Sequence, residues 1–286
     1  MMYIDSFRFP GVNAEEQFVN YIRRTCYTSF YPFGVFATNQ LQALEFSEIT
    51  ILYGNNGSGK STALNLIAEM LKAERDTLYN RSSFFGDYIG MCKFEMTPGE
   101  RPEEIRMITS DDVFDFMLNL RALNDGVDRK REQVFDEWIE NRNSKFQMKS
   151  LDDYEQLKKI VEARSKTQSR YVREAIGSNI IEHSNGESAL QYFSEKIKDN
   201  GLYLLDEPEN SLSPQRQIEL LQFIQNSARF FGCQFIIATH SPFLLTLKGA
   251  RIYDLDATPV DIKKWTELDG VRTYFEFFEQ HREEFL

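Results

Sequence analysis

The sequence between residues 54 and 61, Gly-Asn-Asn-Gly-Ser-Gly-Lys-Ser, joins an apolar segment to a segment with helical periodicity. Residues 44–53 before it have the composition of a β-strand. After it, Leu64, Ile67, Ala68 and Leu71 recur at the spacing of a helix that is buried on most sides. A strand, a glycine-rich turn and a helix in this order form a phosphate-binding loop, in which backbone N–H groups and the helix dipole surround phosphate oxygens.

This pattern predicts an α/β chain of the P-loop class. An accidental glycine-rich turn is the alternative, and it explains neither the flanking elements nor the Lys-Ser-Thr sequence. Lys60 is expected to reach the β and γ phosphates of a nucleotide, and Ser61 to bind Mg²⁺. The residues predicted to hold the nucleotide are Gly54, Asn55, Asn56, Gly57, Ser58, Gly59, Lys60, Ser61 and Thr62.

A second apolar segment, residues 202–205, is followed directly by Asp206 and Glu207. In a parallel sheet the ligand lies at the carboxyl ends of the strands. We therefore expect Asp206 to hold Mg²⁺, directly or through water, and Glu207 to polarise the attacking water as a general base. A solvated acidic turn is the alternative, but so apolar a strand is expected at the centre of a sheet.

The last third of the chain alternates strand-like and helix-like segments. Residues 235–238 and 250–255 are predicted strands, and a helix is predicted to begin at Ser213-Pro214. Val271, Tyr274, Phe275 and Phe278 share one face of a closing helix. Such alternation predicts a mostly parallel sheet covered by helices. His240 follows the segment 235–238 and is expected to contact the γ-phosphate and orient water, although a single histidine at a strand end is more often structural.

Residues 184–188, Ser-Asn-Gly-Glu-Ser, precede an amphipathic segment that contains Ala189, Tyr192 and Phe193. Small residues before a helix are suited to binding an anion at its N-terminus. Alone, this sequence would usually be a helix cap. Its position in the chain, between the glycine loop and the Asp206-Glu207 pair, favours an anion-binding role.

Taken in order, the loop at 54–61, the sequence 184–187, the strand that ends in Asp206-Glu207, and His240 resemble the motifs of the ABC ATPases. The chain resembles the RecF/SMC-like branch and, more closely, short bacterial ATPases that are linked to DNA repair or antiphage defence. The resemblance implies a single ABC-type head over residues 1–286, with an N-terminal antiparallel β-subdomain. It also implies a helical insertion or lid at 111–181, with the signature motif at its end, at about 184–188.

The resemblance further implies that ATP with Mg²⁺ is held between two heads. Lys60, Ser61, Asp206, Glu207 and His240 would act on the nucleotide of their own head. The signature of the other head, Ser184, Asn185, Gly186 and Glu187, would cover the same nucleotide, in a homodimer or a hetero-assembly. A separate effector protein would sense the closed state.

Two departures from the family pattern leave other functions open. After the strand-like residues 105–109 the chain has Ser110-Asp111-Asp112 where the family has a glutamine, so Asp111 is the candidate for its Mg²⁺ and water contacts. Residues 210–213 lack the usual aspartate. A nucleotide-sensing scaffold with little hydrolysis and the nucleotide-binding subunit of a transporter are the alternatives. A small-molecule kinase explains neither residues 184–187 nor His240.

Composition limits the partners. The net charge of −11 and a pI near 5.0 argue against a general nucleic-acid coat, which needs clustered Lys and Arg. Residues 121–173 hold 13 Lys/Arg against 10 Asp/Glu, so a nucleic-acid contact there is possible, although a solvated helical face is the simpler interpretation. Three widely spaced cysteines, no signal segment and no run of 18 apolar residues predict a cytoplasmic protein without a membrane span.

Overall fold

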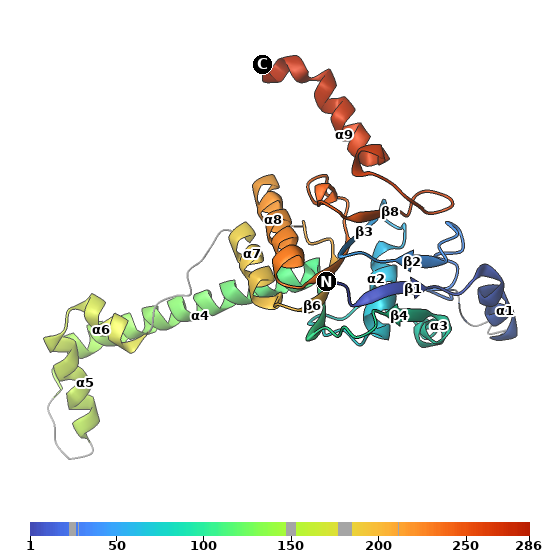
Figure 1. Cartoon of the computed structure of the whole chain (residues 1–286). Coiled ribbons are helices and arrows are strands. Elements are labelled where there is room, and N and C mark those ends of the chain that lie inside the picture. The colour runs from blue at the N-terminus through green and yellow to red at the C-terminus, as the bar shows by residue number, and fades with distance from the viewer. Residues whose placement is uncertain (23–26, 28, 147–152, 177–184, 211) are drawn as a thin grey trace. The chain divides into compact units, whose positions relative to one another are not determined.

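The computed structural model describes residues 1–22, 27, 29–146, 153–176, 185–210 and 212–286 of the chain (Figure 1). Two sheets and their helices form an α/β fold. The strands are β1 (Ile4–Arg8), β2 (Ala43–Glu45), β3 (Ile49–Tyr53), β4 (Lys93–Met96), β5 (Glu104–Thr109), β6 (Gly201–Asp206), β7 (Gln234–Ala238), β8 (Arg251–Asp254) and β9 (Asp261–Ile262). The α-helices are α1 (Val12–Ile22), α2 (Lys60–Met70), α3 (Phe85–Met91), α4 (Ser110–Asn143), α5 (Tyr154–Ser165), α6 (Gln168–Ala175), α7 (Asn185–Lys196), α8 (Pro214–Phe230) and α9 (Asp269–Gln280).

The larger sheet has the strand order β5-β6-β7-β3-β8-β9, and its first five strands run parallel. Strands β3, β6 and β7 are apolar at almost every position and are buried on both faces, as expected for the centre of a parallel sheet. In register, Asp206 lies opposite Ala238, and Ala238 lies opposite Leu52. The segments that follow β6, β7 and β3 therefore emerge side by side at one edge of the sheet.

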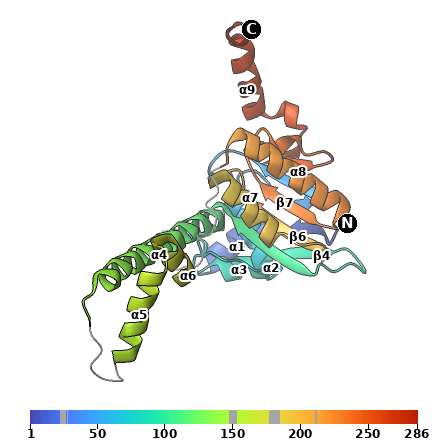
Figure 2. The ribbon, with the colours of Figure 1, turned by 90° about the vertical axis from the view of Figure 1, so that its left-hand side faces the viewer.

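Helices cover both faces of this sheet. Leu202, Leu204 and Ile236 point to the face on which α2 packs, in one core with Leu64 and Ile67. Because neighbouring side chains of a strand point to opposite faces, the equally buried alternate residues face the other side. Figure 2 shows α7 and α8 next to one another over β6 and β7, where α8 contacts β7.

A three-stranded antiparallel sheet, in the order β2-β1-β4, forms the N-terminal subdomain. Phe7 lies opposite Leu44 on one side and Phe94 on the other. The single strand expected over residues 44–53 is two strands in different sheets, since residues 46–48 turn the chain from β2 into β3. Residues 33–38 have a composition that favours a strand, but they form turns, and Gly34 has a φ of +86°.

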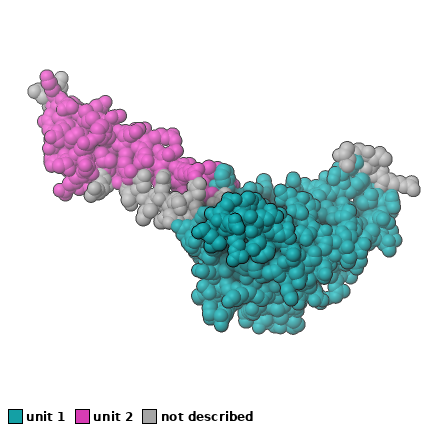
Figure 3. All heavy atoms as spheres, turned by 90° about the horizontal axis from the view of Figure 1, so that it is seen from above, with its two compact units in different colours: residues 1–114, 185–286 teal, residues 115–184 magenta. Residues whose placement is uncertain are grey.

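The chain divides into two compact units (Figure 3), residues 1–114 with 185–286, and residues 115–184. The second unit contains most of α4 together with α5 and α6. Ile160 and Ala163 of α5 are buried, and Glu174 pairs with both Lys166 and Arg170 at 2.8 Å. No helix among the described residues combines the length and apolar character needed to cross a bilayer.

Candidate functional site

The loop at 54–59 joins β3 to α2 and depends on glycine. Gly57 and Gly59 have φ angles of +87° and +97°, in the left-handed region that residues other than glycine rarely adopt. A Cβ atom at Gly59 would also lie 3.0 Å from Val35 Cγ1 and 3.1 Å from Phe36 Cε1. Asp256 holds the start of the loop, because its carboxylate accepts hydrogen bonds of 2.9 and 3.1 Å from the Asn55 N–H.

Replacing Gly59 with alanine is expected to lower the free energy of unfolding by roughly 1–3 kcal/mol, through backbone strain and crowding against Phe36. Denaturant titration measures this change. Gly57→Ala tests backbone strain alone, since a Cβ there meets nothing within 4 Å, and Gly86→Ala in α3 is the neutral control. Equal stability of the Gly59 and Gly86 variants would contradict the account.

Lys60 is the first residue of α2 and is only 4% exposed. Its ammonium donates hydrogen bonds to the carbonyl oxygens of Gly54 at 2.7 Å and Asn55 at 3.2 Å. It also lies 3.8 Å from the Glu207 carboxylate. The buried Lys60 ammonium is thus held by the loop and faces the carboxylate of Glu207 at the end of β6. In the same first turn of α2, Thr62 accepts a hydrogen bond of 3.1 Å from the Tyr31 hydroxyl.

Ser61 and Asp206 are brought together from positions 145 residues apart. The Ser61 hydroxyl donates a 3.0 Å hydrogen bond to Asp206 Oδ1. Burial raises the pKa of Asp206 to about 6, and the neighbouring Glu207 charge adds to the rise, while the Ser61 hydrogen bond opposes it. A hydroxyl and a carboxylate that ionises above that pH are oxygen ligands of the kind that Mg²⁺ uses with nucleotide phosphates.

Glu207 has a φ of +48°, a strained conformation for a residue with a long side chain. Its backbone N–H donates to the Ala238 carbonyl at 2.9 Å, which ties the turn after β6 to the end of β7. Its carboxylate accepts a 3.1 Å hydrogen bond from the Asn210 amide and lies 3.7 Å from His240 Nδ1. The carboxylate therefore has cationic or polar neighbours from three separate segments.

His240 is held in place by a residue that sequence reasoning missed. Glu209 is 5% exposed, and its Oε1 accepts hydrogen bonds from Thr239 Oγ1 at 2.6 Å, His240 N at 3.0 Å and Ser241 N at 3.1 Å. The same oxygen lies 3.7 Å from His240 Nδ1. Glu209 is visible in the sequence Asp-Glu-Pro-Glu, but nothing in that spacing shows that it folds back on residues 239–241.

Glu209→Ala is expected to lower the turnover number by roughly 10- to 100-fold, because three donors lose one charged acceptor worth about 1.5–3 kcal/mol per bond. ATP affinity should change less, since the hydrogen bonds that Glu209 accepts come from residues 239–241 and not from the loop at 54–61. Steady-state kinetics separates the two effects. Glu209→Gln keeps an acceptor and should recover part of the rate; a rate as low as that of the alanine variant would contradict a positioning role.

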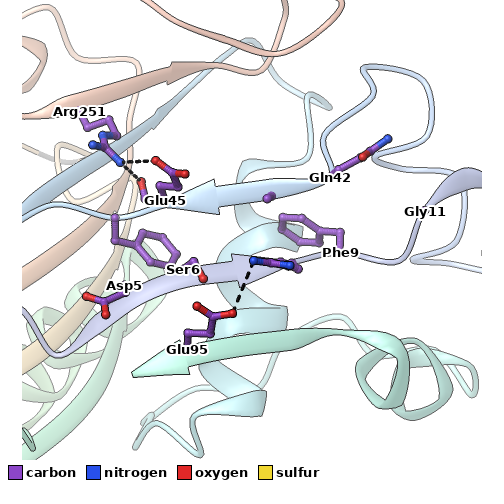
Figure 4. Close-up of a pocket in the computed structure, with 11 residues that line it drawn as sticks. Asp5, Ser6, Phe9, Gly11, Gln42, Glu45, Glu95 and Arg251 are labelled. Carbon is purple, nitrogen blue, oxygen red and sulfur yellow. Dashed lines mark hydrogen bonds and ion pairs between the residues drawn. The ribbon is translucent and has the colours of Figure 1, made fainter. Parts of the chain in front are cut away.

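A cavity of about 680 Å³ opens at these strand ends and contains several of the predicted residues. Its lining comprises Tyr53, Gly54, Asn55, Asn56, Glu207, Asn210, His240, Gly270 and Tyr274. A separate cavity on the antiparallel sheet (Figure 4) contains none of them, and both of its arginines are paired with glutamates: Arg8 with Glu95 at 3.5 Å and Arg251 with Glu45 at 3.4 Å.

The other predicted residues have less definite surroundings. Ser184 lies outside the described residues. Asn185, Gly186 and Glu187 form the first turn of α7, and their side chains are not described. Asp111 is exposed in the first turn of α4, so its proposed contact with Mg²⁺ stays a prediction. The neighbouring Asp112 is buried and accepts bonds of 2.6 and 2.9 Å from Thr109, whose backbone pairs with that of Asp206.

The chain is similar to known proteins in sequence and in fold. The sequence profile described as ABC transporter matches residues 42–210, more than half of the chain, and the profile described as AAA ATPase domain matches residues 180–245. No curated protein matches the chain significantly.

Several solved structures have a similar fold. The Smc head domain from Pyrococcus furiosus, with an extended coiled coil and bound to the C-terminal domain of ScpA, is 14% identical; the match covers 99% of this chain and 100% of that one, with a TM-score of 0.42. A dimeric post-hydrolysis state of the ATP-binding cassette MJ0796, bound to ADP and Pi, is 15% identical over 79% of this chain and 90% of that one, with a TM-score of 0.36. A nucleotide-free ATP-binding cassette from an ABC transporter is 14% identical over 82% of this chain and 87% of that one, with a TM-score of 0.38.

The family assignment rests on the sequence profile over residues 42–210 and not on these structural likenesses. The chain belongs to the ABC transporter family, as an ABC-type ATPase with the P-loop fold of that family.

Proposed function

We propose that this chain is an ATPase head that closes on a second head around two ATP molecules and reopens after hydrolysis. The observation that supports this best is the position of Glu207 at the ends of adjacent strands. Its carboxylate lies 3.8 Å from the Lys60 ammonium, 3.7 Å from His240 and next to the bonded pair of Ser61 and Asp206. A base, a cation, a metal-binding pair and an orienting histidine are the groups that phosphoryl transfer to water needs.

Each residue has a role in this proposal. Lys60 and the loop amides bind the β and γ phosphates, and Ser61 and Asp206 hold Mg²⁺. Glu207 accepts a proton from the attacking water, and His240 orients that water or the γ-phosphate. Mg²⁺ would neutralise charge on the phosphates, which is chemistry that these side chains alone do not supply.

The signature residues 184–187 are proposed to act on the nucleotide of the other head. Gly186 and its neighbours form the first turn of α7, and the N-terminus of a helix favours an anion. Closure is then a two-state change that ATP favours and hydrolysis reverses. The closed form would act on a separate effector protein, in the DNA repair or antiphage setting that the sequence resemblance implies.

The test of this proposal is the mass of the protein in solution. The Glu207→Gln variant should bind ATP without turning it over, so its mass should double with ATP and Mg²⁺ and remain that of a monomer without them. Wild type with ADP is the control. A monomer of Glu207→Gln at saturating ATP would contradict closure between two copies and would direct attention to a hetero-assembly.

A nucleotide sensor with little hydrolysis is the second candidate. It is favoured by the site beside β5, where Thr109 and the buried Asp112 bond each other and no glutamine follows the strand. Measured turnover decides between the two. Rates that are equally low in wild type and in Glu207→Gln would favour the sensor.

A further inference from the structure

One face of α9 is apolar and stays open to solvent along most of its length. Val271, Tyr274, Phe275 and Phe278 follow the spacing of one helical face, but only Val271 is buried. Phe275 is 68% exposed and Phe278 is 53% exposed. Beyond the helix, Phe285 packs edge-to-face on Phe278 with ring centroids 6.1 Å apart and is itself exposed. We call Tyr274, Phe275, Phe278 and Phe285 the aromatic face of α9.

The base of α9 is attached to the strand that leads into the phosphate-binding loop. Leu268 and Val271 are buried, and the Gly270 N–H donates a 3.1 Å hydrogen bond to the hydroxyl of Tyr53. A Cβ atom at Gly270 would lie 2.5 Å from that hydroxyl, so glycine permits the close approach. Tyr53 is the last residue of β3, directly before Gly54. The rest of α9, red in Figure 1, extends away from the sheet.

The aromatic face is also continuous with the nucleotide site. Tyr274 and Gly270 line the same cavity as Glu207, Asn210 and His240. A molecule that covers this cavity therefore contacts Tyr274, and Phe275 and Phe278 continue the exposed surface along the same helix. An exposed apolar patch of this kind, at the edge of a polar site, marks a surface that binds another macromolecule.

We infer that the aromatic face of α9 docks on a second copy of this chain when two heads close on ATP. The inference rests on the proposed function and adds a binding surface to it. A second copy is the occupant that fits, because closure brings another head over the cavity that Tyr274 shares with Glu207 and His240. The aromatic side chains supply apolar area outside the phosphate contacts, and aromatic residues often dominate binding at such interfaces.

The test uses the full chain with Glu207→Gln as the parent, since that variant is expected to hold the closed state. Phe275→Ser and Phe278→Ser are combined in the parent, and the dimer dissociation constant is measured by analytical ultracentrifugation with saturating ATP and Mg²⁺. The matched control is Phe230→Ser with Phe231→Ser. These phenylalanines are 65% and 48% exposed and precede β7, at the edge of the sheet opposite to the nucleotide site.

The expected result is a dimer at least roughly tenfold weaker for the α9 pair of substitutions, with the control within twofold of the parent. Binding of a fluorescent ATP analogue by the monomer should stay unchanged, because neither phenylalanine lines the cavity. An α9 variant that dimerises as well as the parent overturns the inference and leaves the proposed function intact. This holds also where the variant no longer binds some other protein through that face. A parent that never dimerises overturns the proposed function and the inference together.

A second measurement avoids any effect of the substitutions on folding. A photo-crosslinking phenylalanine analogue at position 278 should yield a covalent dimer on irradiation, only with ATP and Mg²⁺. The same analogue at position 230 should yield none. Equal crosslinking from both positions, or crosslinking at 278 that ignores ATP, would overturn the inference.

Discussion

Glu207→Gln is expected to slow ATP turnover by roughly 10²- to 10³-fold, because general-base assistance to the attacking water is lost. The substitution keeps the size of the side chain and an oxygen that can accept the 3.1 Å hydrogen bond from the Asn210 amide. It removes the negative charge that lies 3.8 Å from Lys60 and 3.7 Å from His240. ATP should therefore bind at least as well as before, since its phosphates no longer meet a neighbouring carboxylate.

The strained backbone supports this assignment. A φ of +48° at a glutamate costs of order 1–3 kcal/mol, and such strain persists mainly where function requires it. Single-turnover kinetics with radiolabelled ATP measures the chemical step directly. Glu219→Gln is the matched control, because Glu219 is a carboxylate on α8 that pairs with Arg216 at 2.6 Å. A Glu207→Gln rate within a few fold of wild type would remove Glu207 from the role of base.

Asp206→Asn is expected to make the protein more stable and inactive. The pKa of Asp206 rises from the ordinary 3.8 to about 6, so the folded state favours the protonated carboxyl. Below about pH 4 the folded and the unfolded states both carry this proton. As the pH rises from about 4 to about 6, the unfolded chain loses the proton first, so the free energy of unfolding falls. Above pH 6 that cost is on the order of 3 kcal/mol, and asparagine, which cannot ionise, avoids it.

The pH dependence of the stability gain is the sensitive readout. Asp206→Asn should raise the free energy of unfolding by about 1–3 kcal/mol at pH 8 and by little at pH 4. Asparagine can still accept the hydrogen bond of Ser61, but it is a poor Mg²⁺ ligand, so turnover should fall by at least roughly 10²-fold. Urea titrations at the two pH values measure the gain. A gain of equal size at both would contradict burial of the charge as its cause.

The same ionisation predicts how wild type responds to pH. Binding of Mg²⁺ needs the ionised carboxylate, so its affinity in the presence of ATP should fall about tenfold per pH unit below 6. Titrating Mg²⁺ at fixed ATP between pH 5 and pH 8 measures this slope. In Asp206→Asn the slope should be smaller, because only the terminal phosphate of ATP still titrates in this range.

Much of the site could be predicted because its residues belong to continuous motifs. The segments before Gly54 and Asp206 are apolar enough to mark central strands, and parallel strands end at one edge of a sheet. The proximity of Ser61 and Asp206, 145 residues apart, follows from that rule alone. Strand β7, which lies between β6 and β3 and positions His240, fits the same pattern.

Other features depend on contacts that sequence spacing does not show. In the sequence, Glu209 is one more acidic residue after Asp206 and Glu207. Only the fold brings its Oε1 to the backbone N–H of His240. Residues 33–38 have a strand-like composition, yet the apolar Val35 and Phe36 are turn residues that face Gly59. The aromatic residues of α9 predict an amphipathic helix correctly, but the periodicity does not tell whether its partner lies within the same chain.

The most direct test of closure between two heads is a mixing experiment with two inactive variants. Lys60→Ala should fail to bind ATP productively, and Gly186→Asp should place a negative charge where the signature meets phosphate. In a mixed dimer, the intact loop of the Gly186→Asp head faces the intact signature of the Lys60→Ala head. We expect the mixture to hydrolyse ATP although neither variant does so alone. A mixture as inactive as its components, with both variants folded and able to form mixed dimers, would contradict a site shared between two heads.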